Sequence, residues 1–513
     1  MLLGSPAMAD TFLADNDRAD ATREPLFSFD NSYARLPERF FARLSPVPVA
    51  QPRLIRVNEA LARTLGLEPQ RLSAPDGVLA LAGNRVPQGA EPLAMAYAGH
   101  QFGNWVPQLG DGRAILLGEV RAADGERYDI QLKGSGPTPF SRNGDGRAGL
   151  GPVLREYIVS EAMAGLRIPT TRSLAMVATG EQILRQEGPV PGAVLTRVSR
   201  SHVRVGTFEY FGNRGDEDAV RLLADYAIAR LYPDAANAEQ PYRALLDGVI
   251  ARTAALIASW QLVGFIHGVM NTDNASIAGE TIDYGPCAFM DAYDPATVFS
   301  SIDRGGRYAY GNQPRIAHWN LVRFAQALLP LLGPDEDAAL KAAQDAINAY
   351  PVQFEAAYHA GLGAKCGLAQ SREGDLPLIG ELFRHMKDGH ADFTLTFRYL
   401  CDSAEQIDDG LRSLFDNASA LDVWLAKWRE RLALETVAPA DRAASMRAVN
   451  PKYIARNHRV EAVIAAAQER ADFAPLDELL NVLSAPFDDR PEFAAYADPP
   501  RPEEVVLQTF CGT

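Results

Sequence analysis

The stretch HGVMNTDNASIAGETIDYGP, residues 267–286, holds a His-Gly, an Asp-Asn pair and an Asp-Tyr-Gly triplet. Asn274 and Asp283 are oxygen ligands nine positions apart, and such a pair suits Mg²⁺ when a nucleotide supplies the remaining oxygens. Asp273, directly before Asn274, is a carboxylate that is able to accept a proton. The stretch therefore predicts a metal-dependent nucleotide site with Asp273 as its candidate base.

The same stretch follows the catalytic-loop pattern of a protein kinase, with one residue replaced. In kinases, His-x-Asp is followed by four residues and an Asn, and Asp-Phe-Gly comes a little later. Counted from His267, the position of the catalytic Asp holds Val269, whereas Asn274 and Asp283 stand where the metal ligands belong. Val269 cannot take a proton, so kinase-type base catalysis at that position is excluded. Asp273 remains as a base that would act from a different geometry.

The chain on either side of this stretch changes from a mixed pattern to a helical one. Strands joined by the turn AADG are predicted at 113–120 and 127–134, a helix at 151–166, and further strands at 171–179, 181–187 and 192–199. From about residue 218 the pattern is helical, with predicted helices at 222–232, 244–265, 319–332 and 420–435. We therefore predict an α+β, bilobal, protein-kinase-like fold with a small β-rich N-lobe and a large helical C-lobe.

The expected domain boundaries follow from this change of pattern. Residues 1–90 are punctuated by prolines and contain only short helical stretches, so we expect an N-terminal extension packed on the N-lobe. Residues 91–200 are the expected N-lobe, with a glycine-rich loop, a strand lysine and a helix glutamate. Residues 201–513 are the expected C-lobe, which includes the catalytic loop and the C-terminal tail.

Composition restricts the class of protein. A chain of 513 residues is too long to fold around one ordinary hydrophobic core, so two or more lobes are expected. Its content of 47% apolar and 22% charged residues is typical of a soluble globular enzyme. The net charge of −15 argues against a general nucleic-acid binder, although a local cluster of Arg and Lys can still attract a polyphosphate. No window approaches the roughly 18 uninterrupted apolar residues of a membrane span, and the first thirty residues lack the pattern of a targeting signal. We expect a cytoplasmic protein with no membrane partner.

Two glycine-rich segments and one lysine are candidate nucleotide contacts. Gly110 and Gly112 come just before a predicted strand, where their backbone could approach a ligand, and Arg113 adds a positive charge. An ordinary turn that leads into a β-hairpin would have the same pattern. Lys133 ends an alternating strand, where it either reaches a phosphate or is a solvated strand end. The helix at 151–166 offers Glu156 and Glu161 as partners. Helical periodicity places Glu161 nearer the apolar side, and the residues alone do not choose between them.

Further charged residues are ambiguous from the sequence. The segment 144–152 has the form G-x-G-x-x-G, but no strand precedes it, which disfavours a dinucleotide site and leaves a phosphate near the helix N-terminus. Arg197, Arg200 and Arg204 form either a salt-bridge cluster or a phosphate clamp. The four cysteines (Cys287, Cys366, Cys401 and Cys511) contain no Cys-x-x-Cys spacing, so neither a disulfide scaffold nor a structural zinc site is expected.

Long runs of this sequence resemble the selenoprotein O family (SelO/YdiU), a group of kinase-fold proteins. The matching runs cover residues 97–119, 129–148, 168–181, 267–286 and 450–458. The family is described as pseudokinases because the usual catalytic Asp is missing, as at Val269. The resemblance implies protein adenylylation, in which ATP binds flipped relative to a kinase. AMP then passes to a Ser, Thr or Tyr hydroxyl of a protein, or of the chain itself, and pyrophosphate leaves.

The resemblance also implies a role for each candidate residue. Gly110, Gly112, Arg113, Asp145 and Gly146 would line the nucleotide site, and Lys133 would hold phosphate oxygens and pair with Glu156. Arg197 and Arg204 would bind the far phosphates, and Asp273 would accept the proton. Asn274 and Asp283 would ligate Mg²⁺, and Asp283 would also contact the nucleotide. Buried cations of this kind would stabilise the departing pyrophosphate.

Some alternatives remain open at this level. A conventional kinase is still possible, because Asp273 could act as its base. A non-catalytic nucleotide-binding scaffold is also possible: it would explain why Val269 replaces the catalytic Asp, but it would give the retained Lys133 no role. The sequence does not distinguish uridylylation, which would use UTP with Mn²⁺, from adenylylation, which would use ATP with Mg²⁺. In the family, a selenocysteine or cysteine near the C-terminus can form a redox link to the loop after Asp-Tyr-Gly. Here the tail has Cys511 and residues 288–365 have no cysteine, so we expect an unpaired thiol in a monomer.

Overall fold

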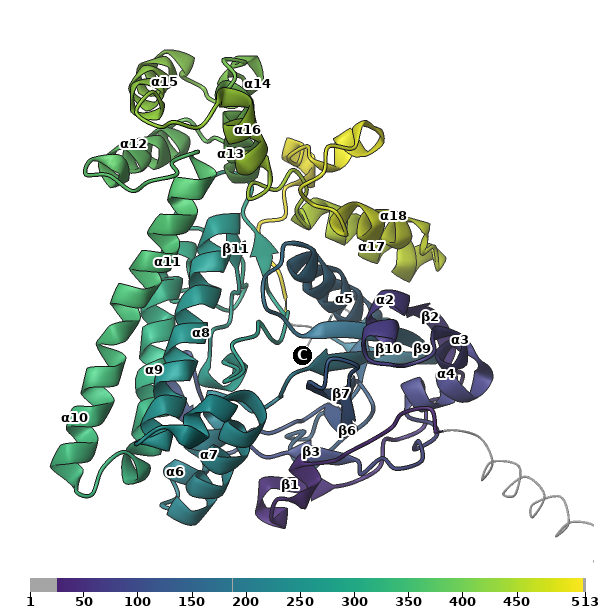
Figure 1. The fold of residues 1–513 in the computed structure, drawn as a ribbon. Helices are drawn as coiled ribbons and strands as arrows, with labels where there is room; N and C mark the ends of the chain where they lie inside the picture. The colour runs from purple at the N-terminus through teal and green to yellow at the C-terminus, as the bar shows by residue number, and fades with distance from the viewer. Residues whose placement is uncertain (1–24, 187, 511–513) are drawn as a thin grey trace, which may run out of the picture.

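The computed structural model describes residues 25–186 and 188–510. A sheet region, residues 25–199, lies beside a helical region, residues 200–510 (Figure 1). This arrangement confirms the expected α+β class, with strands in the N-terminal part and helices in the C-terminal part. The expectations for the polar N-terminus before residue 25 and for Cys511 fall outside the described residues.

Within the described residues, the main sheet has eight strands in the order β1-β3-β6-β7-β10-β9-β2, with β8 paired to β10. All of these pairs are antiparallel. The strands are β1 (Phe41–Arg43), β2 (Arg53–Val57), β3 (Leu93–Met95), β6 (Ala114–Arg121), β7 (Arg127–Lys133), β8 (Ala148–Gly149), β9 (Arg172–Arg185) and β10 (Gly188–Ser199). The predicted hairpin is confirmed as β6 and β7. Strands β1 and β2, in the segment expected to be an extension, are part of this same sheet.

The prediction of separate strands at 171–179 and 181–187 is wrong, because β9 runs through both segments. Gly180 lies inside β9, opposite a register shift of β10 between Pro191 and Ala193. A glycine at this position makes a β-bulge, which lets the strand continue, rather than the turn that would end it. Residue 187 itself lies outside the described residues.

The two faces of the sheet are covered by different helices. Ile130 and Leu132 of β7 pack in a core that includes residues of α2 (Glu59–Thr64), α3 (Pro69–Ser73) and α4 (Pro75–Ala82). Because strand side chains alternate, Gln131 and Lys133 point to the opposite face. On that face Leu195 of β10 packs in a core shared with α5 (Leu150–Gly165). The alternation therefore brings Lys133 to the side on which the helical region lies.

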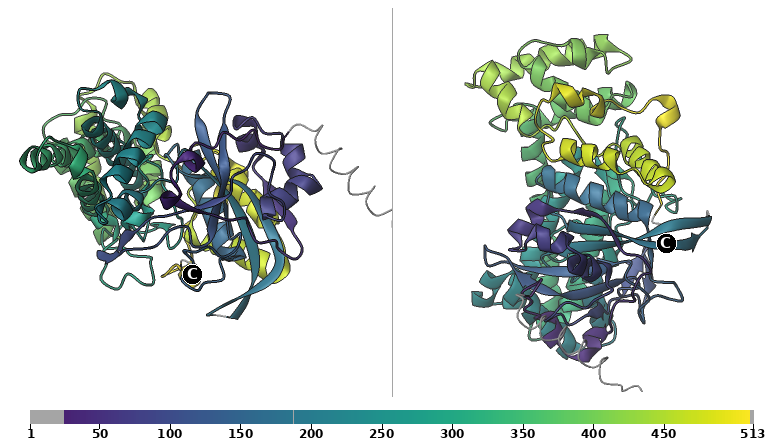
Figure 2. Two further views of the ribbon diagram at one scale, coloured as in Figure 1. Left: turned by 90° about the horizontal axis from the view of Figure 1, so that it is seen from below. Right: turned by 90° about the vertical axis from the view of Figure 1, so that its right-hand side faces the viewer.

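The helical region is built around α8, which packs against α7, α9, α10 and α11. The remaining bounds are α6 (Val205–Gly212), α7 (Glu217–Leu231), α8 (Pro241–Val263), α9 (Gln313–Leu328), α10 (Glu336–Ile347), α11 (Ala349–Lys365), α12 (Asp375–Asp388), α13 (Phe393–Ser403), α14 (Asp409–Arg412), α15 (Ala418–Leu432), α16 (Pro439–Arg447), α17 (Asn457–Arg470) and α18 (Ala474–Leu483). Helix α8 is long and apolar enough to cross a membrane, but half of its apolar window is buried, as in a core helix. Helices α17 and α18 return to the sheet region and lie against α5 (Figure 2).

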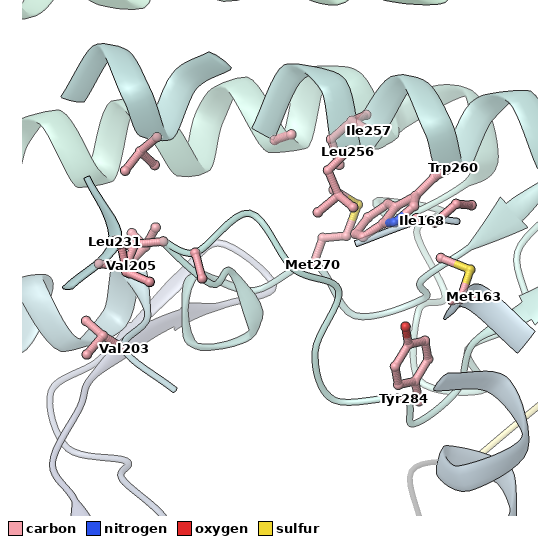
Figure 3. Close-up of a cluster of buried hydrophobic side chains, with 14 of the residues drawn as sticks. Met163, Ile168, Val203, Val205, Leu231, Leu256, Ile257, Trp260, Met270 and Tyr284 are labelled. Atoms are coloured by element: carbon pink, nitrogen blue, oxygen red, sulfur yellow. The ribbon is translucent and has the colours of Figure 1, made fainter. Parts of the chain in front are cut away.

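The stretch 267–286 is held by both backbone pairing and apolar packing. The short strands β11 (Phe265–Ile266) and β12 (Ala288–Phe289) pair antiparallel on either side of it. Its own Met270 and Tyr284 are buried in the cluster that includes Ile257 and Trp260 of α8 (Figure 3). The apolar residues of the stretch thus anchor it to α8, while Asp273, Asn274 and Asp283 lie at the space between the two regions.

Candidate functional site

A cavity of about 1140 Å³ lies between the sheet region and the stretch 267–286. It is lined by every residue predicted to contact the nucleotide, accept the proton or ligate the metal: Gly110, Gly112, Arg113, Lys133, Asp145, Gly146, Arg197, Arg204, Asp273, Asn274 and Asp283. These residues come from segments up to 173 positions apart, as the numbers Gly110 and Asp283 show. Tertiary packing therefore brings the predicted site residues together in one place.

Lys133, Glu156 and Arg197 form a buried charge cluster at one wall of this cavity. Nζ of Lys133 pairs with Oε2 of Glu156, and Nη2 of Arg197 lies 2.6 Å from Oε1 of the same carboxylate. Burial lowers the pKa of Lys133. Burial acts to raise the pKa of Glu156, but Arg197 and Lys133 outweigh it and hold that pKa below its usual value. Lys133 is thus a phosphate-binding candidate and not the solvated strand end that the sequence left open.

The expectation from periodicity, which placed Glu161 rather than Glu156 nearer the apolar side, is wrong. Glu156 is 1% exposed, whereas Glu161 is only partly buried and is paired with Arg172 at 2.7 Å. The physical reason is that α5 is covered on two sides, by the sheet on one and by α17 and α18 on the other. A polar position opposite the apolar stripe is therefore still buried, and it must be paired.

Asp283 is the second acid of the cavity wall, and two arginines neutralise it. Nη2 of Arg197 lies 2.8 Å from Oδ1, and Nη1 of Arg204 pairs with Oδ2. Burial would raise the pKa of Asp283, but Arg204, Arg197 and Lys133 outweigh it and hold the pKa well below its usual value. The guanidinium of Arg204 also lies 4.7 Å from the centre of the Tyr97 ring. Guanidinium groups bind phosphate oxygens in the same bidentate way as carboxylate oxygens, so both arginines are candidate phosphate contacts.

Asp273 is a buried carboxyl with few hydrogen bonds. It is 7% exposed, and its Oδ2 accepts one hydrogen bond from Nε2 of Gln101 at 3.2 Å. Within the described part of the chain, its Oδ1 has no hydrogen-bond partner. Burial raises the pKa of Asp273 to about 6, so the group is mostly ionised at neutral pH and more basic than an exposed aspartate. These are the properties of a general base.

The two predicted glycine-rich segments approach each other at the cavity rim. Phe140, between them, contacts the backbone at Gly110 and Gly112. Asp145 is paired with Arg185 at 2.8 Å and accepts a hydrogen bond from the backbone of Arg147. Asp145 is therefore engaged in an ion pair at the rim, and both of its partners also line the cavity.

Comparison with known proteins assigns the family. The family described as "Protein adenylyltransferase SelO" matches residues 26–484. The chain belongs to the SelO family. This result confirms the resemblance inferred from the sequence motifs.

Relatives of this SelO-family chain are similar over nearly their whole length. The chain is 64% identical over 488 residues to the protein nucleotidyltransferase YdiU of Rhodopseudomonas palustris (strain BisB18), covering 95% of this chain and 99% of the relative. Identity to the YdiU of Bradyrhizobium sp. (strain ORS 278) is 63% over 488 residues, with the same shares covered. The family and these names indicate that the chain is a nucleotidyltransferase, an activity that implies ATP as substrate.

Only two of the predicted site residues are candidate metal ligands in this SelO-family chain. Asn274 and Asp283 both line the cavity and both carry side-chain oxygens, and Nδ2 of Asn274 donates to the carbonyl of Val269 at 2.9 Å. Among the described residues, no group of three or more His, Cys, Asp or Glu is placed to hold a metal. One or two protein oxygens plus nucleotide phosphates is nevertheless the usual ligand set of Mg²⁺. The donor set therefore fits Mg²⁺ that arrives with a nucleotide.

Several cavity residues were not predicted from the sequence. Gln101, Asp111, Arg142, Arg147 and Arg185 line the cavity. Asp111 lies between the two predicted glycines, and Gln101 falls within the run 97–119, but neither had a periodicity or motif that marks a ligand. Arg200, by contrast, lies outside the cavity lining and pairs with Glu126 at 2.7 Å.

The described end of the tail reaches the rim of the cavity. Oγ1 of Thr509 donates to the carbonyl of Pro286 at 2.7 Å, and Pro286 lines the cavity. Cys287, next along the chain, is fully buried in the core, and burial raises the pKa of its thiol to about 12. A buried thiol with a raised pKa is poorly reactive.

Proposed function

We propose that this chain transfers AMP from ATP to Ser, Thr or Tyr hydroxyls of proteins, with release of pyrophosphate and with Mg²⁺ bound. The observation that carries the proposal is one cavity that combines a buried carboxylate of raised pKa, Asp273, with the buried cations Lys133, Arg197 and Arg204. The names of the relatives, protein nucleotidyltransferases, support proteins as the acceptors.

The charge of the cavity supports a triphosphate as its ligand. Among the described residues, seven cationic side chains line it, against four carboxylates: Arg113, Lys133, Arg142, Arg147, Arg185, Arg197 and Arg204 against Asp111, Asp145, Asp273 and Asp283. The whole chain, in contrast, has a net charge of −15. A local excess of cations in an acidic protein attracts an anionic ligand to that place.

We also propose that the two regions are the lobes of a protein-kinase-like fold. The pairing of a strand lysine, Lys133 of β7, with a helix glutamate, Glu156 of α5, supports this proposal, because the same kind of pair orients the phosphates in kinases. The resemblance to the family further implies an ATP that lies flipped relative to a kinase, with its β- and γ-phosphates toward the buried cations.

The proposed reaction is a displacement at the α-phosphorus. The carboxylate of Asp273 takes the proton of the acceptor hydroxyl, and the hydroxyl oxygen forms a bond to the α-phosphorus. The bond between the α-phosphorus and the oxygen bridging to the β-phosphorus breaks, and its electron pair leaves with pyrophosphate. Lys133, Arg197 and Arg204 stabilise the negative charge that develops on that leaving group.

Asn274 and Asp283 are the residues that would hold Mg²⁺. The ion would neutralise part of the phosphate charge when the nucleotide is bound. In the structure, both oxygens of Asp283 are paired with Arg197 and Arg204. The phosphates would take over these arginines and thereby free Asp283 for the metal.

The test uses purified protein, Mg²⁺ and ATP labelled in parallel at the α- or the γ-phosphate, with a generic protein acceptor. We expect label on protein only from the α-position, and we expect Asp273→Ala to lose about 10²- to 10⁴-fold in rate while still binding ATP. Label only from the γ-position would establish a kinase and contradict the proposal. ATP binding without any transfer would indicate a scaffold, and transfer from α-labelled UTP with Mn²⁺ alone would indicate a uridylyltransferase.

A further inference from the structure

The short hairpin of β4 (Gly99–Gln101) and β5 (Asn104–Val106) has no part in the chemistry proposed above. It lies within residues 97–119, one of the runs that resemble the SelO family. It lies directly on the loop that carries Asp273. The backbone N–H of His100 donates to Oγ1 of Thr272 at 2.7 Å, and that of Phe102 donates to Oδ1 of Asn271 at 3.0 Å. Between them, Nε2 of Gln101 donates to Oδ2 of Asp273 at 3.2 Å. Three consecutive hairpin residues thus bind three consecutive loop residues.

The hairpin is itself fixed from behind. Nδ1 of His100 lies 2.6 Å from Oε1 of Glu209 on α6, and Glu209 is 1% exposed. The imidazole packs against the rings of Trp105 and Trp319, at centroid distances of 5.0 and 5.2 Å. Phe102 has a φ of +53° and its ring lies 5.1 Å from that of Tyr308. A hairpin held in this way is a rigid support for the loop.

The backbone of Gly99 closes the other side of the Asp273 carboxyl. A Cβ at position 99 would lie 2.4 Å from Oδ1 and 2.9 Å from Cβ of Asp273. Only glycine therefore permits the carboxyl to lie where it does. One oxygen of Asp273 rests against Gly99 and the other is bonded to Gln101, so the hairpin contacts both.

We propose that Gln101 is a positioning residue that fixes the orientation of the Asp273 carboxylate for proton transfer, with the backbone at Gly99 as the opposing wall. This inference rests on the proposed role of Asp273 as the base. Asp273 lies in a loop, and among the described residues its carboxylate has no hydrogen-bond donor other than Gln101. Loss of the Gln101 amide would let the carboxylate rotate, and misplacement of a catalytic group by about 1 Å costs on the order of 100-fold in rate.

The first test replaces Gln101 with Met, which has a similar length but no N–H donor. We expect Gln101→Met to lower kcat for transfer of α-label by about 10- to 100-fold, with KM for ATP and the melting temperature unchanged. Gln108, exposed and outside the cavity lining, provides the matched control: Gln108→Met should retain the wild-type kcat. Gly99→Ala should reproduce the loss of kcat, because its methyl group would push the carboxylate aside.

A second test distinguishes positioning from a structural or substrate-contacting role. In an Asp273→Ala background, measured by single turnover at high enzyme concentration, Gln101→Met should cause no further loss, because a residue that acts only through Asp273 is silent without it. An equal loss in both backgrounds would overturn the inference while leaving the proposed function intact. So would a wild-type kcat for Gln101→Met. Failure of the wild-type chain to transfer α-label would overturn the proposed function, and the inference with it.

Discussion

At the scale of single residues, Glu280 has an acid-base property that affects stability rather than catalysis. Its Oε2 accepts hydrogen bonds from Oγ of Ser199 at 2.8 Å and from the backbone of Arg200 at 3.2 Å. Burial raises its pKa to about 7, above the value of roughly 4.3 for an unfolded chain. Between these two values the folded protein binds a proton that the unfolded chain has released. The free energy of unfolding therefore falls as the pH rises through this window.

We expect Glu280→Gln to stabilise the protein at alkaline but not at acidic pH. The amide oxygen can still accept the two hydrogen bonds, and the buried charge is removed. The free energy of unfolding should rise by about 1–3 kcal/mol at pH 8 and stay unchanged at pH 5, as measured by urea unfolding at both values. Glu161→Gln is the control of opposite sign, because it breaks the ion pair with Arg172. An equal effect of Glu280→Gln at both pH values would contradict this explanation.

At the scale of elements, the C-terminal cap of helix α8 determines where the chain leaves the helix and enters the stretch 267–286. Gly264 ends the helix with a φ of +71°, and its N–H bonds to the carbonyl of Trp260. Strand β11 begins at the next residue and leads directly into the loop of Asp273. A Cβ at position 264 would lie 2.9 Å from Cδ1 of Phe393. Both the backbone conformation and the packing therefore require glycine.

We expect Gly264→Ala to lower the free energy of unfolding by about 2–4 kcal/mol, from the left-handed conformation and the contact with Phe393 together. Gly215 has a similar φ of +68° with nothing within 4 Å of its missing Cβ. Gly215→Ala should therefore cost only the backbone part, about 1–2 kcal/mol. Chemical denaturation of both variants gives the comparison. Equal losses would show that Phe393 relaxes and that packing at this cap does not matter.

At the scale of the whole molecule, the ion pair between Arg197 and Asp283 connects the sheet region to the helical region across the cavity. Arg197 belongs to β10 of the sheet region, whereas Arg204, just before α6, pairs with Asp283 from within the helical region. We expect that, without a metal, Asp283 would compete with phosphates for these arginines and would repel the phosphates. On the proposed function, the same carboxylate would weaken nucleotide binding without Mg²⁺ and support it when Mg²⁺ is bound.

We expect Asp283→Ala to bind ATP about tenfold more tightly than wild type in EDTA, a change of about 1.4 kcal/mol, and to lose transfer activity when Mg²⁺ is present. Titration calorimetry in EDTA measures the first effect and the α-label assay the second. Lys133→Ala, which removes a cation from the same wall, should weaken binding under both conditions. Weaker binding of ATP by Asp283→Ala in EDTA would show that Asp283 orders the arginines rather than competing for them.

The sequence by itself determined the α+β class, the β6–β7 hairpin and the residues of the cavity that lie in motifs, such as Lys133, Asp273 and Asp283. These depend on local periodicity and on short spacings, which a single chain carries in full. Only the tertiary structure decided between Glu156 and Glu161, joined the two predicted strands into β9, and placed Gln101 on Asp273. Glu156 and Gln101 are placed by segments from distant parts of the chain, and β9 continues through Gly180 because of its bulged pairing with β10. Neither long-range burial nor a bulge leaves a periodic signal in the sequence.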